Sequence, residues 1–251
     1  MNLPFTLADV SLLQALLIIV TAFGASIVGG LAGYGTGLLL PLVLVPIVGA
    51  ESAVPVMALA ALFTNTSRAI AFRPLIHWKS VATALPLAII ATITAATMFT
   101  SLNQRGAAIV VGCVLMALVP LRHILKKIGY RLNTPGLAVG GGVYGFVTGT
   151  STGAGVILVS ILMAAGLTGT AVVATDAAIS IAIGIAKVTT FGSLGALPLP
   201  LFIFALLVGC ATIPGAFVAR KLAGKISATA HTWILDAAVL IGGAVMVLRA
   251  L

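Results

Sequence analysis

Residues 12–37 read LLQALLIIVTAFGASIVGGLAGYGTG. The first 20 of them carry no charged side chain, and about 20 apolar residues in a helix are enough to cross a hydrocarbon core about 30 Å thick. The last nine, from Gly29 to Gly37, contain five glycines, which interrupt the helix before the next apolar run begins. This pattern, an apolar segment of membrane length that ends in a glycine-rich break, indicates a membrane helix with a broken end.

The rest of the chain has the same apolar character. Of its 251 residues, 61% are hydrophobic and 7% are charged, and the mean hydropathy is +1.28, whereas a soluble domain has about 25% charged residues. The apolar runs lack the alternation of a membrane β-barrel. We therefore expect an all-α integral membrane protein of about eight to ten transmembrane segments. The expected segments are residues 11–32, 36–48, 52–72, 80–100, 105–122, 136–149, 153–166, 169–191, 199–219 and 229–249.

Several functional classes are excluded by the composition and motifs. The basic residues stand in short clusters without interleaved aromatic residues, which argues against nucleic-acid binding. The three histidines share no metal-ligand spacing, and we find no motif of a hydrolase or an intramembrane protease. We expect no enzyme activity, no cofactor, no metal and no disulfide framework. Asp9 is the only charge before the first apolar segment, so we expect that segment to be retained as a helix.

The basic clusters predict the topology. They contain Arg73 and Lys79, then Arg122, Lys126, Lys127 and Arg131, then Arg220, Lys221 and Lys225. Cytoplasmic loops are rich in Lys and Arg, so the clusters should share one side and be separated by even numbers of crossings. An odd number of segments precedes the first cluster. Both termini are therefore expected on the non-cytoplasmic side.

A second glycine-rich break, residues 145–155, resembles the first. Each break is followed by a short apolar segment, which either crosses the membrane or forms a re-entrant hairpin. The two breaks can be aligned so that Arg68 and Lys187 fall within one residue of each other. We expect a first repeat (1–125), a basic cytoplasmic linker (126–134) and a second repeat (135–251), which the charge topology orients in opposite directions. Inverted repeats with short, glycine-interrupted segments are typical of secondary transporters.

The breaks have the chemistry of an anion site. A broken helix leaves N–H groups that hydrocarbon cannot satisfy, and a helix N-terminus attracts anions. Glycine lets a ligand approach the backbone, and the hydroxyl groups add donors. The alternative is that these glycines only allow close helix packing. The candidate binding residues in the breaks are Gly33, Gly35, Thr36, Gly37, Thr148, Gly149, Thr150, Ser151, Thr152 and Gly153.

Three ionisable residues within apolar segments are candidates for a function. Arg68, with Asn65 three residues before it, and Lys187 are candidate anion ligands, because a charge within a membrane segment is expensive and points to function. The alternative for Arg68 is a position at the cytoplasmic end, where it would snorkel. Asp176 is a candidate for coupling, either by taking a proton or by pairing with a residue of another helix. The alternative is that it lies near the start of its helix and only stabilises the positive end of the helix dipole.

Together these residues resemble the TauE/SafE family of sulfite exporters and anion permeases, over essentially the whole chain. The matching stretches are Leu38-Leu39-Leu40-Pro41-Leu42, Asn65-x-x-Arg68-x-x-x-Phe72, Ile76-His77-Trp78-Lys79, Ala174-Thr175-Asp176-Ala177-Ala178 and Lys187-x-x-x-Phe191. The resemblance implies a secondary transporter of sulfite, sulfoacetate or a similar organosulfonate in the bacterial inner membrane. Its expected partners are the lipid bilayer and a small anion, with proton or sodium coupling left open and no nucleic acid. The break at residues 149–153 has more hydroxyl groups than the family's glycine run, which leaves the exact anion open. A carrier or channel for another solute and a membrane assembly subunit are the alternatives.

Overall fold

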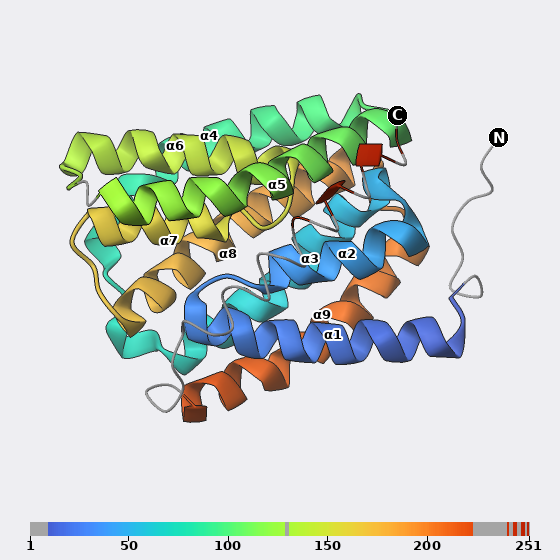
Figure 1. The fold of residues 1–251 in the computed structure, drawn as a ribbon, viewed down its shortest axis with the longest axis horizontal. Coiled ribbons are helices and arrows are strands. Elements are labelled where there is room, and N and C mark those ends of the chain that lie inside the picture. The colour runs from blue at the N-terminus through green and yellow to red at the C-terminus, as the bar shows by residue number, and fades with distance from the viewer. Residues whose placement is uncertain are drawn as a thin grey trace.

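The computed structural model describes residues 10–128 and 131–222, and after them only 240, 243–244, 247–248 and 250. Within these residues the chain forms nine α-helices and one short 3-10 helix (Figure 1). In chain order they are α1 (Leu12–Ala32), α2 (Thr36–Val48), α3 (Ala50–Ala71), η2 (Arg73–Leu75), α4 (Trp78–Thr100), α5 (Gln104–Ile128), α6 (Thr134–Thr150), α7 (Gly155–Ala164), α8 (Thr170–Ser193) and α9 (Leu199–Leu222).

Nine of the ten expected segments are confirmed as helices. Most of their ends lie within two residues of the expected ones, because the apolar runs that define them are long and sharply bounded. The exceptions are the ends of α5, at Ile128 instead of 122, and of α9, at Leu222 instead of 219. In both helices basic residues beyond the apolar run lower the hydropathy but are good helix formers. The tenth expected segment, 229–249, and the expected position of the C-terminus fall mostly or wholly outside the described residues.

Six of these helices are long and apolar enough to cross a membrane: α1, α3, α4, α5 up to residue 121, α8 and α9. By contrast, α2 has 13 residues and α7 has 10, which correspond to about 20 and 15 Å of helix. Neither can cross a hydrocarbon core of about 30 Å alone. The expected short segments are therefore present, each joined to a longer helix at its glycine-rich break.

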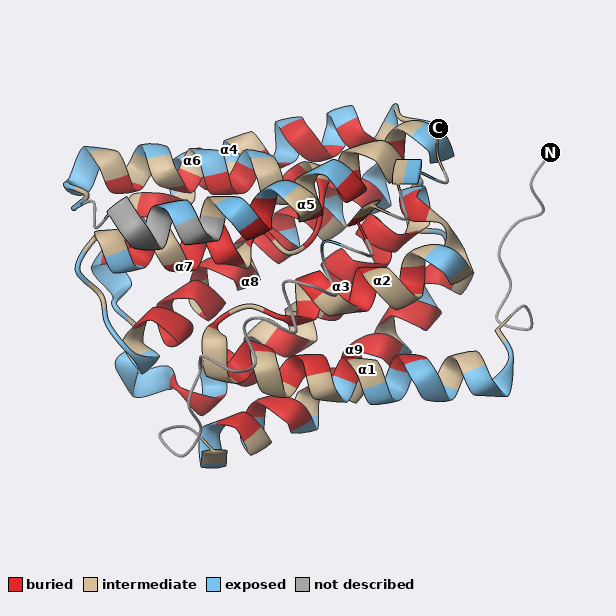
Figure 2. Cartoon of the chain, viewed as in Figure 1, coloured by how far each residue is buried: buried red, intermediate tan, exposed pale blue. Residues whose placement is uncertain are grey.

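Large apolar side chains on the outer helices face outward. Leu12 is 88% exposed and Ile90 is 64% exposed, and Figure 2 shows a long exposed stretch along the start of α1. In water such a surface would drive association, whereas a lipid bilayer solvates it. The exposed apolar surface thus agrees with a protein that contacts lipid on its sides.

Helices α3 and α8 lie at the centre of the bundle and pack against each other. They are the two most buried of the candidate spans, at 61% and 67% of their apolar windows (Figure 2). On either side, α4 packs against α6 and α1 packs against α9. The α4–α6 contact is close, since a Cβ added to Gly145 would lie 2.2 Å from the Ala88 carbonyl oxygen. Small residues thus bring the outer helices together, as is common in membranes.

The basic clusters lie at or just after helix ends on the same side of the bundle: the first follows α3, and the other two include the last turns of α5 and α9. Figure 1 shows α3, α5 and α9 ending at the left, opposite the start of α1. This arrangement agrees with the expectation that the clusters share one side. Lys225 lies outside the described residues, as do the side chains of Arg122, Lys126 and Lys127.

Candidate functional site

The two glycine-rich breaks touch each other inside the bundle. Helix α1 ends at Gly33, which has a φ of +83°, and the second break contains Gly153, which also has a φ of +83°; glycine reaches this region without strain. A Cβ added to Gly37 would lie 2.6 Å from the Gly153 nitrogen. The backbones of the two breaks are therefore in direct contact, and only glycine allows this approach.

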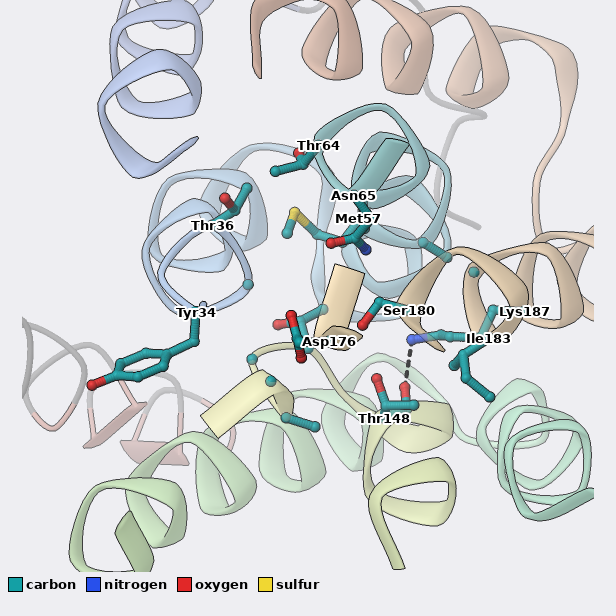
Figure 3. Close-up of a pocket in the computed structure, with 18 of the residues that line it drawn as sticks. Tyr34, Thr36, Met57, Thr64, Asn65, Thr148, Asp176, Ser180, Ile183 and Lys187 are labelled. Carbon is teal, nitrogen blue, oxygen red and sulfur yellow. Dashed lines mark hydrogen bonds between the residues drawn. The ribbon is translucent and has the colours of Figure 1, made fainter. Parts of the chain in front are cut away.

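A cavity of about 100 Å³ lies between the breaks and the central helices α3 and α8 (Figure 3). This volume is well below the ~300–1,000 Å³ of pockets for drug-sized ligands, so the cavity suits a small molecule or ion. Twelve of the fourteen residues expected from the sequence line it. They are Gly33, Gly35, Thr36, Gly37, Asn65, Arg68, Thr148, Ser151, Thr152, Gly153, Asp176 and Lys187.

The other two expected residues, Gly149 and Thr150, do not line the cavity. A Cβ on Gly149 would lie 2.8 Å from the Thr92 carbonyl oxygen of α4, so this glycine serves helix packing. The Thr150 hydroxyl donates to the Val147 carbonyl of its own helix, at 3.2 Å. Gly141, Gly145 and Gly149 of α6 therefore pack against α4, whereas Gly33, Gly35, Gly37 and Gly153 line the cavity.

Arg68 is buried inside the bundle and does not snorkel. Its side chain is on α3 and is 3% exposed. Nη1 donates to the carbonyl oxygens of Gly33, at 2.9 Å, and Gly29, at 3.3 Å, which belong to the last turn of α1. Nη2 forms an ion pair with Asp176 of α8. Arg68 therefore joins three elements: the end of α1, α3 and α8.

Lys187 occupies a similar place on α8. Lys187 is 5% exposed. Its Nζ donates to two carbonyl oxygens at the end of α6, those of Thr148, at 2.5 Å (Figure 3), and Ser151, at 3.0 Å. Nζ also lies 5.8 Å from the centre of the Phe191 ring, a cation–π distance. Among the described residues no carboxylate pairs with Lys187.

The structure adds two polar residues that the sequence did not single out. The Tyr144 hydroxyl of α6 and the Ser180 hydroxyl of α8 lie 2.9 Å apart and both line the cavity. Ser180 lies between Asp176 and Lys187 in Figure 3, four residues after the first and seven before the second. This spacing on one helical face could have identified Ser180 from the sequence. No such pattern marks Tyr144, because it stands alone in a glycine-rich helix.

The remaining donors of the cavity suit an anion. Helices α2 and α7 begin there, and no side chain caps either N-terminus; a helix N-terminus presents N–H groups without intrahelical partners and the positive end of the dipole. The Thr152 hydroxyl is buried and has no hydrogen-bond partner among the described residues. The same part of the chain contains no cluster of three metal-binding side chains. The arrangement can therefore hold a small oxyanion between cations, N–H groups and a hydroxyl group.

Comparison with known families matches residues 18–246 to the family described as Sulfite exporter TauE/SafE. Searches among curated proteins and solved structures gave no match. The matched region covers most of the chain and contains both breaks, Arg68, Asp176 and Lys187. With its bundle of apolar helices and its candidate membrane spans, this multi-pass membrane protein belongs to the TauE/SafE sulfite exporter family of transporters.

Proposed function

We propose that this protein is a secondary transporter that moves a small sulfur-containing anion, such as sulfite or an organosulfonate, by alternating access. The anion binds in the cavity between the two breaks. Arg68 and Lys187 attract it, and the N-termini of α2 and α7, the Thr152 hydroxyl and the Asn65 amide supply hydrogen bonds. The breaks move relative to each other to open the cavity to either side of the membrane.

One observation carries this proposal: two buried cations, each held at the broken end of a helix, line one small cavity. A buried charge is costly in a bilayer and is retained where it has a function. Structural capping of the helix ends explains the two hydrogen bonds that each cation donates to carbonyls. It does not explain why both cations line a cavity at which α2 and α7 also begin, and half-helix N-termini bind anionic substrates in other transporters built from broken helices.

The proposal includes an inverted duplication of residues 1–125 and 135–251, joined by the linker 126–134. A constant spacing between equivalent residues of the two halves supports it. Residues 119 positions apart line the cavity from α3 and α8. The pairs are Met57 and Asp176, Ala61 and Ser180, Thr64 and Ile183, Asn65 and Gly184, and Arg68 and Lys187.

The helix packing supports the same duplication. If α1 corresponds to α6, α3 to α8 and α4 to α9, the contact of α1 with α9 corresponds to that of α6 with α4. The contact between α3 and α8 then lies on the pseudo-twofold axis. Figure 1 shows α1 running toward the left and α6 running toward the right, the opposed directions that an inverted repeat requires.

The proposed location is the bacterial inner membrane, with the N-terminus and the C-terminus on the non-cytoplasmic side. Asp176 is the proposed coupling residue. Its Oδ2 pairs with Arg68 while Oδ1 is buried without a hydrogen-bond partner among the described residues. A proton taken up at Asp176 would release Arg68 from the ion pair and so connect proton movement to the anion site.

The test is uptake of labelled sulfite and of labelled organosulfonates by purified protein in liposomes, with and without a proton gradient. We expect saturable uptake of at least one of these anions and none in liposomes without protein. Saturable uptake only of an unrelated solute, or no uptake of any small anion, would contradict the proposal, and the second result would favour an assembly subunit.

A further inference from the structure

The two halves of the cavity differ at one charged position. Asp176 forms the ion pair with Arg68. The residue 119 positions before Asp176 is Met57, which lies at the corresponding place on α3 and also lines the cavity. Lys187 therefore has a thioether at the place where Arg68 has a carboxylate. One cation is neutralised by the protein and the other is not.

The net charge of the cavity follows from its charged side chains and from the helix ends that meet there. Among the described lining residues the only charged side chains are Arg68, Asp176 and Lys187, and each of these residues is 5% exposed or less, so salt screens them little. The ends of α1 and α6 bring roughly half a negative charge each, and the starts of α2 and α7 bring roughly half a positive charge each. The helix dipoles cancel, and one net positive charge remains.

We propose that Asp176 and Met57 set the charge of the transported anion, so that the site takes anions with a single negative charge. This inference rests on the proposed function. A monoanion neutralises the cavity, whereas a dianion leaves an uncompensated buried negative charge, which is costly. The preferred class is hydrogensulfite and monosulfonates. Sulfoacetate, which carries a carboxylate besides its sulfonate, is disfavoured.

The experiment compares two sulfonates that share a carbon skeleton and differ by one charge. Isethionate ends in a hydroxymethyl group and carries one negative charge; sulfoacetate ends in a carboxylate and carries two. Uptake of each labelled compound into liposomes that contain the full chain is measured at equal concentration. Potassium and valinomycin on both sides hold the membrane potential at zero, which removes the difference in driving force. We expect the wild type to take up isethionate at least about tenfold faster.

Two variants test the residues. Asp176→Asn keeps an oxygen that can accept from Arg68 but removes the charge, so the isethionate preference should fall at least about tenfold. Asp176→Glu keeps the charge and should retain the preference. Met57→Asp gives Lys187 a carboxylate of its own and should lower isethionate uptake at least about tenfold.

The outcomes separate this inference from the proposed function. Equal uptake of the two sulfonates by the wild type would overturn the charge selection while leaving the transporter function intact. An unchanged preference in Asp176→Asn, or unchanged isethionate uptake in Met57→Asp, would overturn the assignment to these residues. The wild-type comparison needs no variant and decides the selectivity even where a variant does not fold. No saturable uptake of any small anion by the wild type would overturn the proposed function itself.

Discussion

Arg68 and Lys187 make equivalent contacts with carbonyl groups at the ends of α1 and α6. Arg68 donates to the carbonyl of Gly29 and Lys187 to that of Thr148, and each cation follows its acceptor by 39 positions. The Gly29 carbonyl also accepts from the Gly33 N–H, but the carbonyls of Gly33 and Ser151, beyond the last turns, have no partner within their helices and accept from the same two cations at 2.9 and 3.0 Å. In hydrocarbon an unsatisfied carbonyl costs several kcal/mol. Each cation therefore satisfies the broken end of a helix and, at the same position, lines the cavity.

Transport should not depend on sodium. In transporters built from broken helices, the coupling cation binds at half-helix C-terminal ends and freed carbonyls, and here Arg68 and Lys187 occupy the carbonyls of both ends. We expect equal uptake when sodium is replaced by N-methylglucamine on both sides of the liposome. Uptake that falls with sodium removal at constant ionic strength would show a sodium site that these cations do not exclude.

Gly37→Ala should separate the two breaks. The added Cβ would lie 2.6 Å from the nitrogen and 2.8 Å from the Cα of Gly153, and backbone atoms cannot move aside as a side chain can. We expect a loss of about 1–3 kcal/mol of stability from overpacking, measured by thermal unfolding in detergent, and loss of anion uptake. Gly24→Ala is the matched control, because a Cβ there meets nothing within 4 Å; a similar loss in the control would contradict the explanation.

The Arg68–Asp176 ion pair should behave as a unit in stability measurements. Arg68→Met leaves a buried carboxylate alone, which costs about 3–5 kcal/mol and should lower the melting temperature in detergent. Arg68→Met combined with Asp176→Leu should recover part of this loss, because two apolar side chains can replace a buried pair at little cost. A double variant that is less stable than Arg68→Met would mean that Asp176 stabilises the fold without Arg68.

The proposed orientation can be tested by cysteine labelling. Asn103 lies between α4 and α5, and Lys79 lies in the first turn of α4, at its opposite end; both are exposed. With Cys113 and Cys210 replaced by alanine, we expect an impermeant maleimide added outside cells to label Asn103→Cys. It should label Lys79→Cys only after the membrane is opened. The reverse pattern would invert the topology.

Much of the fold could be predicted from the sequence because hydropathy sets the ends of membrane helices directly. The starts of α2 and α9 were predicted to the residue. The end of α5 was not, since a helix can continue past the apolar region with basic residues. The matched breaks indicated one shared site but not the contact between Gly37 and Gly153. A pattern of residues does not give the distance between segments so far apart in the chain.

Most residues of the candidate site could be predicted from the sequence, but the contacts among them could not. The sequence singled out Asp176 and Lys187 as charges within one apolar segment and left open whether Asp176 pairs with a residue of another helix. It could not identify Arg68 as the partner of Asp176, because the pairing depends on how α3 and α8 pack. Gly149 was assigned to the cavity from its place in the break, although its closest neighbours belong to α4. In a run of small residues, helix packing and ligand binding leave the same pattern.

The most direct test of the anion site is uptake of labelled sulfite and isethionate into liposomes by Lys187→Met and Lys187→Arg, beside the wild type. Lys187 is the cation that no carboxylate neutralises among the described residues, so its charge is the one available to the anion. Size-exclusion chromatography shows that each variant is folded. The account predicts loss of saturable uptake in Lys187→Met and retained uptake in Lys187→Arg. Uptake by a well-folded Lys187→Met at the wild-type rate would contradict it.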